Sequence, residues 1–321
     1  PVPSDWSYAT EPVPPLGAGQ LLVRVAYLSV DPAMRGWMND ARSYIPPVGI
    51  GEVMRALGAG HVVASNHPGF AVGDAVTGVF GVQAYAVSDG RGVTKVDPAV
   101  APLPVFLGTL GMTGYTAYFG LFDLGRPVAG QTVVVSGAAG AVGMVVGQLA
   151  KRHGCRVVGI AGGPEKCAWL VDALGFDAAI DHRAPGMVEA LKVHCPRGVD
   201  VYFDNVGGDV LDAVLTRLAR GARVVICGAI SQYNEAAPRG PKNYLSLLVN
   251  RASMTGMVVF DYADRYPEAL AALTAAYTAG ALQSREQLVD GLEAFPDALG
   301  MLFRGENTGK LVLKVDDGSA V

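Results

Sequence analysis

The fold is decided by one stretch in the middle of the chain, Val133-Val134-Val135-Ser136-Gly137-Ala138-Ala139-Gly140-Ala141-Val142-Gly143. Its β-branched run predicts a buried parallel strand, and the glycines after it predict a tight turn into a helix. Such glycines let the backbone approach a pyrophosphate, whose charge is stabilised by the free amides of a helix N-terminus. Ala138 stands where the strict GxGxxG pattern, aligned on Gly140 and Gly143, has its first glycine. The stretch predicts dinucleotide binding, and the alternative is a tight turn that only allows close helix packing.

Strands and helices alternate on the carboxyl side of this stretch. The expected strands are Arg156–Ile160, Ala178–Ile180, Val199–Phe203 and Arg223–Ala229, and the expected helices are Ala141–His153, Glu165–Leu174, Met187–Val193 and Asp209–Leu218. This alternation predicts an α/β domain with a doubly wound parallel sheet and helices on both faces.

The two ends of the chain differ from this middle part. The expected strands before residue 105 are short and lie between turns, at Gln20–Leu28, Gly60–Ala64, Asp74–Phe80 and Ala84–Val87. This spacing predicts a small β-barrel or sandwich. Near the other end we expect a helix at Ala294–Phe303 and a strand at Lys310–Val315. Because that strand has too little nearby to pair with, we expect it to return to the first domain.

The composition narrows the class of protein. Of 321 residues, 50% are hydrophobic and 17% are charged, which excludes disorder as the main state. The net charge of −4 gives no reason to expect a nucleic-acid partner or an anionic membrane surface. The windows Pro98–Phe122 and Pro127–Ala150 lack charge but contain many prolines or glycines, which favours buried core over membrane helices. Four cysteines without a CxxC pair and no visible signal peptide predict a cytoplasmic protein with reduced thiols.

The residues at the end of the second strand of the parallel domain indicate whether the chain binds NAD(H) or NADP(H). NAD-binding sites place a carboxylate there, which binds the ribose hydroxyls. Here the chain reads Ala161-Gly162-Gly163-Pro164-Glu165-Lys166, with no carboxylate at the strand tip. Lys166 supplies a cation instead, although it could also be a solvated lysine in a first helical turn. The pattern favours the 2′-phosphate of NADP(H).

Several motifs in order resemble the medium-chain dehydrogenase/reductase superfamily. Those that resemble the superfamily are Tyr27–Gly36, Leu110–Tyr118 and Ala138–Gly143. Those that resemble its zinc-independent prostaglandin reductase and alkenal double-bond reductase branch are Phe203–Gly208, Cys227–Asn234 and Gly305–Lys310. The resemblance covers nearly the whole chain.

This resemblance implies a GroES-like β-barrel catalytic domain, residues 1–108 with 285–321, around a Rossmann domain, residues 109–284. It implies reduction of the C=C bond of a small-molecule enone or enal with NADPH, and a homodimer. The residues implied to bind the cofactor are Gly140, Ala141, Val142, Gly143, Lys166, Asn205, Cys227, Gly228, Ala229, Ile230, Ser231, Gln232, Tyr233, Met257, Val258, Val259 and Asn307. The family often has a tyrosine where Asp181-His182-Arg183 stands, so His182 or Arg183 is the expected substitute.

No metal site is expected. The first 150 residues contain no cysteine, and Ser29-Val30-Asp31 stands where a zinc-dependent relative carries its ligand cysteine. The five histidines lack ligand spacing. We therefore expect chemistry without zinc.

Reduction of an enone needs a donor near the carbonyl oxygen, where negative charge builds as an enolate. Tyr233 is the candidate, because it follows the expected strand Arg223–Ala229 at its carboxyl end. Its phenol could donate directly or through a ribose hydroxyl, and the alternative is that it only packs on the cofactor. Tyr44 resembles a residue that lines the substrate pocket, or it packs on the neighbouring prolines. The competing functions are a zinc-free NADPH quinone reductase and a non-catalytic NADPH-binding protein.

Overall fold

The computed structural model describes residues 1–315 and divides the chain into two compact units. Unit 1 contains Pro1–Gly108 and the segment that starts at Arg285, and unit 2 is Thr109–Ser284.

Unit 1 is built on a seven-stranded sheet with the strand order β12-β13-β1-β2-β3-β5, in which β4 also pairs with β1. Its elements are η1 (Pro3–Asp5), β1 (Leu21–Ser29), α1 (Met34–Trp37), β2 (Leu57–Ser65), β3 (Ala75–Val79), β4 (Tyr85–Ser88), β5 (Thr94–Lys95), η2 (Leu103–Leu107), β12 (Glu286–Asp290), η6 (Leu292–Ala294), α9 (Phe295–Arg304) and β13 (Lys310–Lys314). In β1 the side chains of Leu21, Val23 and Val25 are all fully buried, and the residues between them are not. This period of two makes β1 a strand with one face in the core, and it confirms the predicted strand-rich domain.

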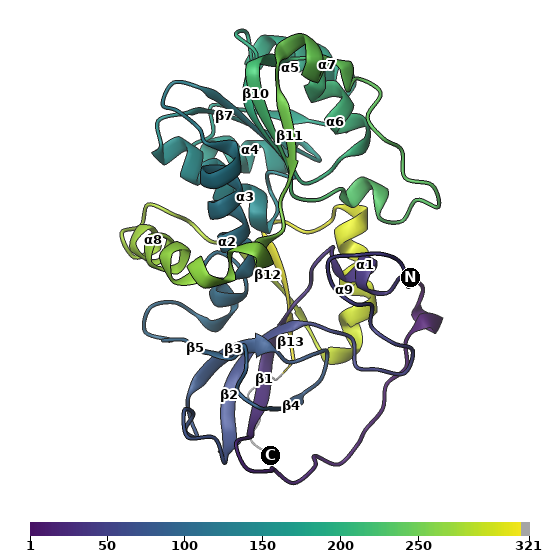
Figure 1. The fold of residues 1–321 in the computed structure, drawn as a ribbon, viewed down its shortest axis with the longest axis vertical. Helices are drawn as coiled ribbons and strands as arrows, with labels where there is room; N and C mark the ends of the chain where they lie inside the picture. Colours follow the sequence, from purple (N-terminus) through teal and green to yellow (C-terminus); the bar gives the residue numbers. More distant parts are fainter. Residues whose placement is uncertain (316–321) are drawn as a thin grey trace. The chain divides into compact units, whose positions relative to one another are not determined.

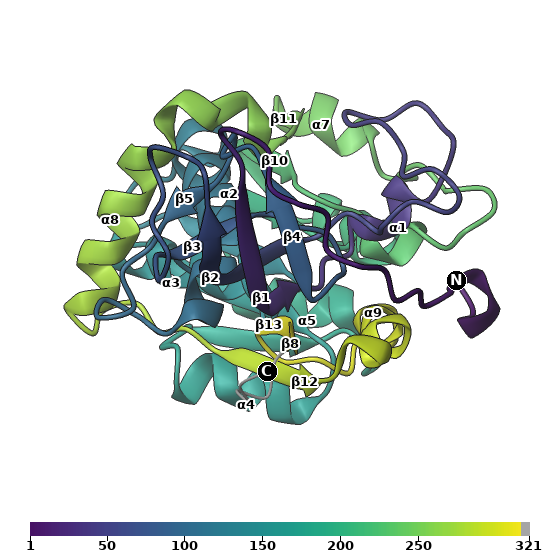
Figure 2. The ribbon, with the colours of Figure 1, turned by 90° about the horizontal axis from the view of Figure 1, so that it is seen from below.

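The last strand returns to the first, as the sequence predicts. β13 pairs antiparallel with β1, with Ser29 opposite Val312 and Tyr27 opposite Lys314 (Figures 1 and 2). The buried ammonium of Lys310 donates to Asp31 Oδ1 at 2.7 Å and to the carbonyl of Val30 at 3.1 Å. The two ends of the chain therefore share one sheet and one buried ion pair.

Unit 2 contains a parallel six-stranded sheet in the order β11-β10-β9-β6-β7-β8. Its elements are α2 (Met112–Phe119), the π-helix η3 (Gly120–Gly125), β6 (Thr132–Ser136), α3 (Ala141–Arg152), β7 (Arg156–Ala161), α4 (Pro164–Asp172), β8 (Ala178–Asp181), α5 (Met187–His194), β9 (Val199–Asp204), α6 (Gly208–Leu215), β10 (Leu218–Ile226), η4 (Ile230–Gln232), α7 (Leu245–Asn250), β11 (Ser253–Gly256), η5 (Val259–Arg265) and α8 (Tyr266–Thr278). Every residue of β6 is buried, as its β-branched run predicts. The predicted doubly wound parallel domain is confirmed.

Three predicted boundaries around β10 are wrong. The strand predicted as Arg223–Ala229 begins five residues earlier, at Leu218, and the other two boundaries are the end of the helix before it and the end of the strand itself. The helix expected to reach Leu218 ends at Leu215, because Leu218 already pairs with Val199 as the first residue of β10. The strand expected to reach Ala229 ends at Ile226. The N–H groups of Cys227 and Gly228 leave the ladder and both donate to the carbonyl of Asp204, at 2.9 and 3.1 Å.

Within residues 1–315 no helix has both the length and the apolar run that a membrane crossing requires.

Candidate functional site

The predicted cofactor residues of unit 2 follow the carboxyl ends of its six strands. Because all six strands are parallel, these ends share one edge of the sheet, where α/β proteins bind ligands. The residues at this edge are Gly140–Gly143 after β6, Lys166 after β7, His182 after β8, Asn205 after β9, Cys227–Tyr233 after β10 and Met257–Val259 after β11. The structure thus gathers at one edge residues that are more than a hundred positions apart.

The glycine turn between β6 and α3 brings backbone groups close together. Gly137 has φ of +56°, and a Cβ added to Gly143 would lie 2.4 Å from the Gly137 carbonyl oxygen. The first helical bond of α3 runs from Met144 N to Gly140 O, so the amides of residues 141–143 have no acceptor within the helix. The first turn of α3 has no acidic residue, whereas its last turn carries Lys151 and Arg152. This helix N-terminus is suited to an anion.

A buried carboxylate, that of Asp204, connects the strand ends at this edge of the sheet. Asp204 has no exposed surface, and its Oδ1 accepts the hydroxyls of Ser136 and Tyr202, both at 2.7 Å. The same carboxylate accepts the N–H groups of Val206 at 3.0 Å and Gly207 at 3.1 Å. Burial raises the pKa of the Tyr202 phenol well above its ordinary value, and the charge of Asp204 adds to this effect. Asp204 therefore ties together the ends of β6 and β9 and the turn after β9.

Asn205 and Cys227 lie directly around this carboxylate. Asn205 Nδ2 donates to the Ser136 carbonyl at 2.7 Å, and Asn205 N donates to Ser136 Oγ at 2.9 Å. Burial, and then the charge of Asp204, raise the pKa of the Cys227 thiol to about 12. The Cys227 thiol is therefore protonated and inert at neutral pH.

Tyr233 folds back onto the loop that follows β10. Its phenol oxygen accepts the N–H of Ala229 at 3.1 Å, and a Cβ added to Gly228 would lie 3.1 Å from the same oxygen. This contact uses an acceptor site of the phenol, which is a donor as well through its O–H. Tyr233 also lies seven residues beyond the end of β10, farther than the predicted strand boundary implied.

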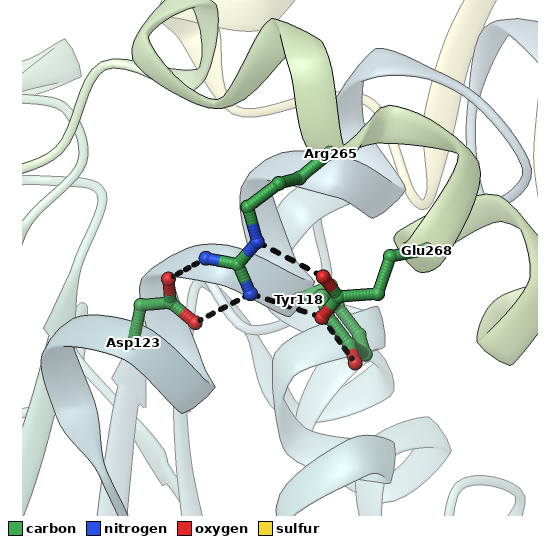
Figure 3. A network of polar contacts seen from close by, with 4 residues as sticks. All are labelled: Tyr118, Asp123, Arg265 and Glu268. Carbon is green, nitrogen blue, oxygen red and sulfur yellow. Dashed lines mark hydrogen bonds and ion pairs between the residues drawn. The ribbon is translucent and has the colours of Figure 1, made fainter.

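The segment after β11 is held by a backbone hydrogen bond at its start and by charged contacts at its end. Met257 N donates to the Ile226 carbonyl at 2.9 Å, and η5 begins at Val259. At the other end of η5, the Arg265 guanidinium donates to both oxygens of Glu268, at 2.9 and 3.0 Å, and pairs with Asp123 of the π-helix (Figure 3).

An aromatic layer lies under the same guanidinium. The Tyr118 hydroxyl donates to Glu268 Oε1 at 3.1 Å, so the network of Figure 3 extends to α2. Arg265 also lies 4.9 Å over the ring of Phe119, which stacks on Tyr262 with 4.7 Å between the ring centroids. The predicted cofactor segment Met257–Val259 is thus followed by an element anchored to α2 and the π-helix.

Two predicted residues lie in unit 1. Tyr44 is in the loop between α1 and β2, and its side chain is 58% exposed. Asn307 precedes β13 and donates from Nδ2 to the Gly309 carbonyl at 3.1 Å.

Sequence reasoning missed the role of Asp204 and Ser136. The available signal was an acidic residue directly after the apolar run Val201–Phe203, at the end of the buried strand Val199–Asp204. Such a position requires hydrogen-bond donors around it.

The residues described, 1–315, contain no group of three or more His, Cys, Asp or Glu side chains that could hold a metal ion. Activity measured after prolonged chelation tests the expectation that the chemistry needs no metal ion.

The chain is similar to known proteins along nearly its whole length. Residues 1–96 match a family model described as the N-terminal domain of oxidoreductase, and residues 141–275 match one described as zinc-binding dehydrogenase. The chain is 43% identical to the NADPH-dependent curcumin reductase of Escherichia coli over 98% of this chain and 93% of the relative. It is 40% identical to the NADP(+)-dependent 2-alkenal reductase of Nicotiana tabacum over 94% and 89%, respectively. The crystal structure of CurA from Vibrio vulnificus in complex with NADPH has 45% identity and a TM-score of 0.94, and the match covers 99% of this chain and 96% of that one.

Proposed function

Because the chain belongs to the zinc-independent medium-chain dehydrogenase/reductase family, in its prostaglandin reductase and alkenal double-bond reductase branch, we propose that it reduces the C=C bond of α,β-unsaturated ketones or aldehydes with NADPH. The observation that carries this proposal is the likeness, over nearly the whole chain, to relatives named as curcumin and 2-alkenal reductases. A 2-alkenal has a C=C bond conjugated to its carbonyl, and the proposal extends that reaction class to this chain.

The carboxyl edge of the unit 2 sheet fits NADP(H). The free amides at the start of α3 and the close backbone approach at Gly143 suit a pyrophosphate. The tip of β7 carries no carboxylate, and Lys166 lies in the first turn of α4. A carboxylate at that tip would repel a 2′-phosphate, whereas an ammonium attracts it. In the proposed complex these residues hold the pyrophosphate and the 2′-phosphate, which are attached to the 5′ and 2′ positions of the adenosine ribose.

Tyr233 is the proposed donor to the substrate. When bound, NADPH supplies the hydride that adds to the β-carbon of the enone. Negative charge then builds on the carbonyl oxygen, and the O–H of Tyr233 is proposed to donate to it directly or through a ribose hydroxyl. The N–H of Ala229, at 3.1 Å from the phenol oxygen, holds that oxygen in place and stabilises charge on it. Tyr44 is the alternative donor.

The proposal is tested by assaying the purified chain on enones, enals, quinones and secondary alcohols with NADPH and with NADH. We expect turnover of the enones or enals with a preference for NADPH, and a saturated carbonyl compound as the isolated product. Turnover of quinones to hydroquinones without any enone turnover would instead identify a quinone reductase. Tight NADPH binding without turnover of any compound in the panel would identify a binding protein.

A further inference from the structure

The segment between β11 and η5 presents backbone groups that the protein itself does not satisfy. Met257 N extends the parallel ladder of β11 with β10 by one hydrogen bond of 2.9 Å. The next bond of a parallel ladder would run from Gly228 N to the Met257 carbonyl, but Gly228 N donates to the carbonyl of Asp204 instead, at 3.1 Å. Within residues 1–315, the Met257 carbonyl and the N–H groups of Val258 and Val259 have no hydrogen-bond partner. This segment therefore offers acceptor and donor groups of the main chain to a ligand.

The strand order places this segment on the side of the sheet away from the adenosine. In the proposed complex the pyrophosphate lies at the start of α3, after β6, and the adenosine ribose lies at the tip of β7. Because the sheet runs β11-β10-β9-β6-β7-β8, the nicotinamide half of the cofactor then extends toward β9, β10 and β11. The carboxamide of nicotinamide accepts through its oxygen and donates through its nitrogen, so it is complementary to the main-chain groups of Met257–Val259.

One side chain from α8 binds the main chain of this segment. The phenol of Tyr266 donates to the Val259 carbonyl at 3.2 Å. Its other acceptor, Met112 Sδ at 3.5 Å, is a thioether and therefore a weak one. The ring of Tyr266 stacks on that of Tyr115 from α2, with 4.9 Å between the ring centroids. The phenol is thus fixed by packing, and its hydrogen bond connects the first residue of α8 to the first residue of η5.

We propose that Tyr266 is a positioning residue for the nicotinamide end of NADP(H), which acts by holding the main chain of Met257–Val259 in the orientation that receives the carboxamide. This inference rests on the proposed function, because it concerns the same cofactor. The N–H and the C=O of Val259 flank one Cα, so a hydrogen bond that fixes the carbonyl also limits the rotations that would turn the N–H away. Tyr266 acts through Val259 and needs no contact of its own with the cofactor.

The test compares two ligands by isothermal titration calorimetry. One is NADP⁺, and the other is adenosine 2′,5′-bisphosphate, which has the phosphate-bearing adenosine of the cofactor and lacks the nicotinamide. Tyr266→Phe keeps the stacked ring and removes only the donor. We expect this variant to bind NADP⁺ about threefold to tenfold more weakly than the natural chain, which corresponds to one neutral hydrogen bond. Its affinity for adenosine 2′,5′-bisphosphate should stay unchanged, whereas a general loosening of unit 2 would weaken the binding of both ligands.

The matched control is Tyr262→Phe. Tyr262 belongs to η5 itself, and its ring stacks on Phe119. In the part of the chain that the structure describes, its hydroxyl makes no hydrogen bond, so this variant should bind both ligands as the natural chain does.

Two results would overturn the inference and leave the proposed function standing. In the first, Tyr266→Phe binds NADP⁺ as tightly as the natural chain does. In the second, the variant loses affinity for NADP⁺ and for adenosine 2′,5′-bisphosphate by the same factor. A natural chain that binds no NADP⁺ would overturn both the inference and the proposed function.

Discussion

The variant Asp204→Ala removes the buried carboxylate and tests whether this group organises the edge of the sheet where the cofactor is proposed to bind. Asp204→Ala leaves four donors without their acceptor: the hydroxyls of Ser136 and Tyr202 and the N–H groups of Val206 and Gly207. An unsatisfied buried donor costs about 1–3 kcal/mol. Because the space that the carboxylate leaves can admit water, we take the lower end for each donor and expect a loss of about 4 kcal/mol in the free energy of unfolding of unit 2.

Two further variants separate the charge from the geometry. Asp204→Asn keeps an oxygen where Oδ1 accepts these four bonds. It loses the charge and puts an amide nitrogen in place of Oδ2, which accepts the N–H of Gly207 at 3.2 Å, so we expect a cost of about 1–2 kcal/mol. Asp200→Ala is the matched control on the same strand. The half-buried Asp200 accepts the single N–H of Thr132 at 2.8 Å, so its loss should cost about 1 kcal/mol.

The assay is urea unfolding followed by tryptophan fluorescence. Trp169 on α4 is the tryptophan of unit 2, and Trp6 and Trp37 belong to unit 1. Replacing the latter two by Phe makes the signal report on unit 2. Affinity for NADPH should weaken in Asp204→Ala as well, because the turn after β9 loses its anchor. If Asp204→Ala costs no more than Asp200→Ala, the carboxylate of Asp204 does not organise this edge of the sheet.

Four other predictions concern the proposed reaction. Tyr233→Phe should lower turnover of an enone by about a hundredfold at saturating NADPH, as for loss of one oxyanion donor, and unchanged turnover would remove the phenol from the chemistry. Lys166→Ala should weaken NADPH binding by about tenfold to a hundredfold and leave NADH binding nearly unchanged; equal use of both cofactors by the natural chain would refute its basis. Gly143→Ala should abolish tight binding of both cofactors in a titration, because its Cβ would lie 2.4 Å from the Gly137 oxygen. Prolonged chelation should leave activity intact, and activity that is lost on chelation and restored by zinc would contradict metal independence.

The local pattern of the sequence determined the elements of unit 2 and their order. The β-branched run Val133–Val135 is apolar enough to be a strand buried on both faces, and the period of the following residues fits a helix with one apolar face. Parallel strands separated by helices must then place their carboxyl ends at one edge. The pattern therefore predicted that the residues after β6, β7 and β10 lie at the ligand-binding edge, whereas the family resemblance alone assigned Asn205, after β9, to the same site.

The local pattern was less informative where strands end. The run from Asp209 to Leu218 has helical spacing throughout, yet Leu218 pairs with Val199 because the neighbouring strand offers hydrogen bonds at that point. Similarly, Cys227 and Gly228 continue an apolar run but donate to the carbonyl of Asp204. A strand boundary depends on its neighbour in the sheet, and that neighbour is not encoded nearby in the chain.

Only the tertiary structure decided which polar groups meet. Asp204 accepts the hydroxyl of Ser136 because β9 and β6 are neighbours in the sheet. His182 lies close to the backbone of Gly162 because β8 and β7 are neighbours. Likewise, Lys310 donates to Asp31 because β13 pairs with β1. Sequence periodicity reports which face of an element is buried, since that depends on residues a few positions apart. The partner of a buried charge is set by strand order and register, which arise from the packing of the whole domain.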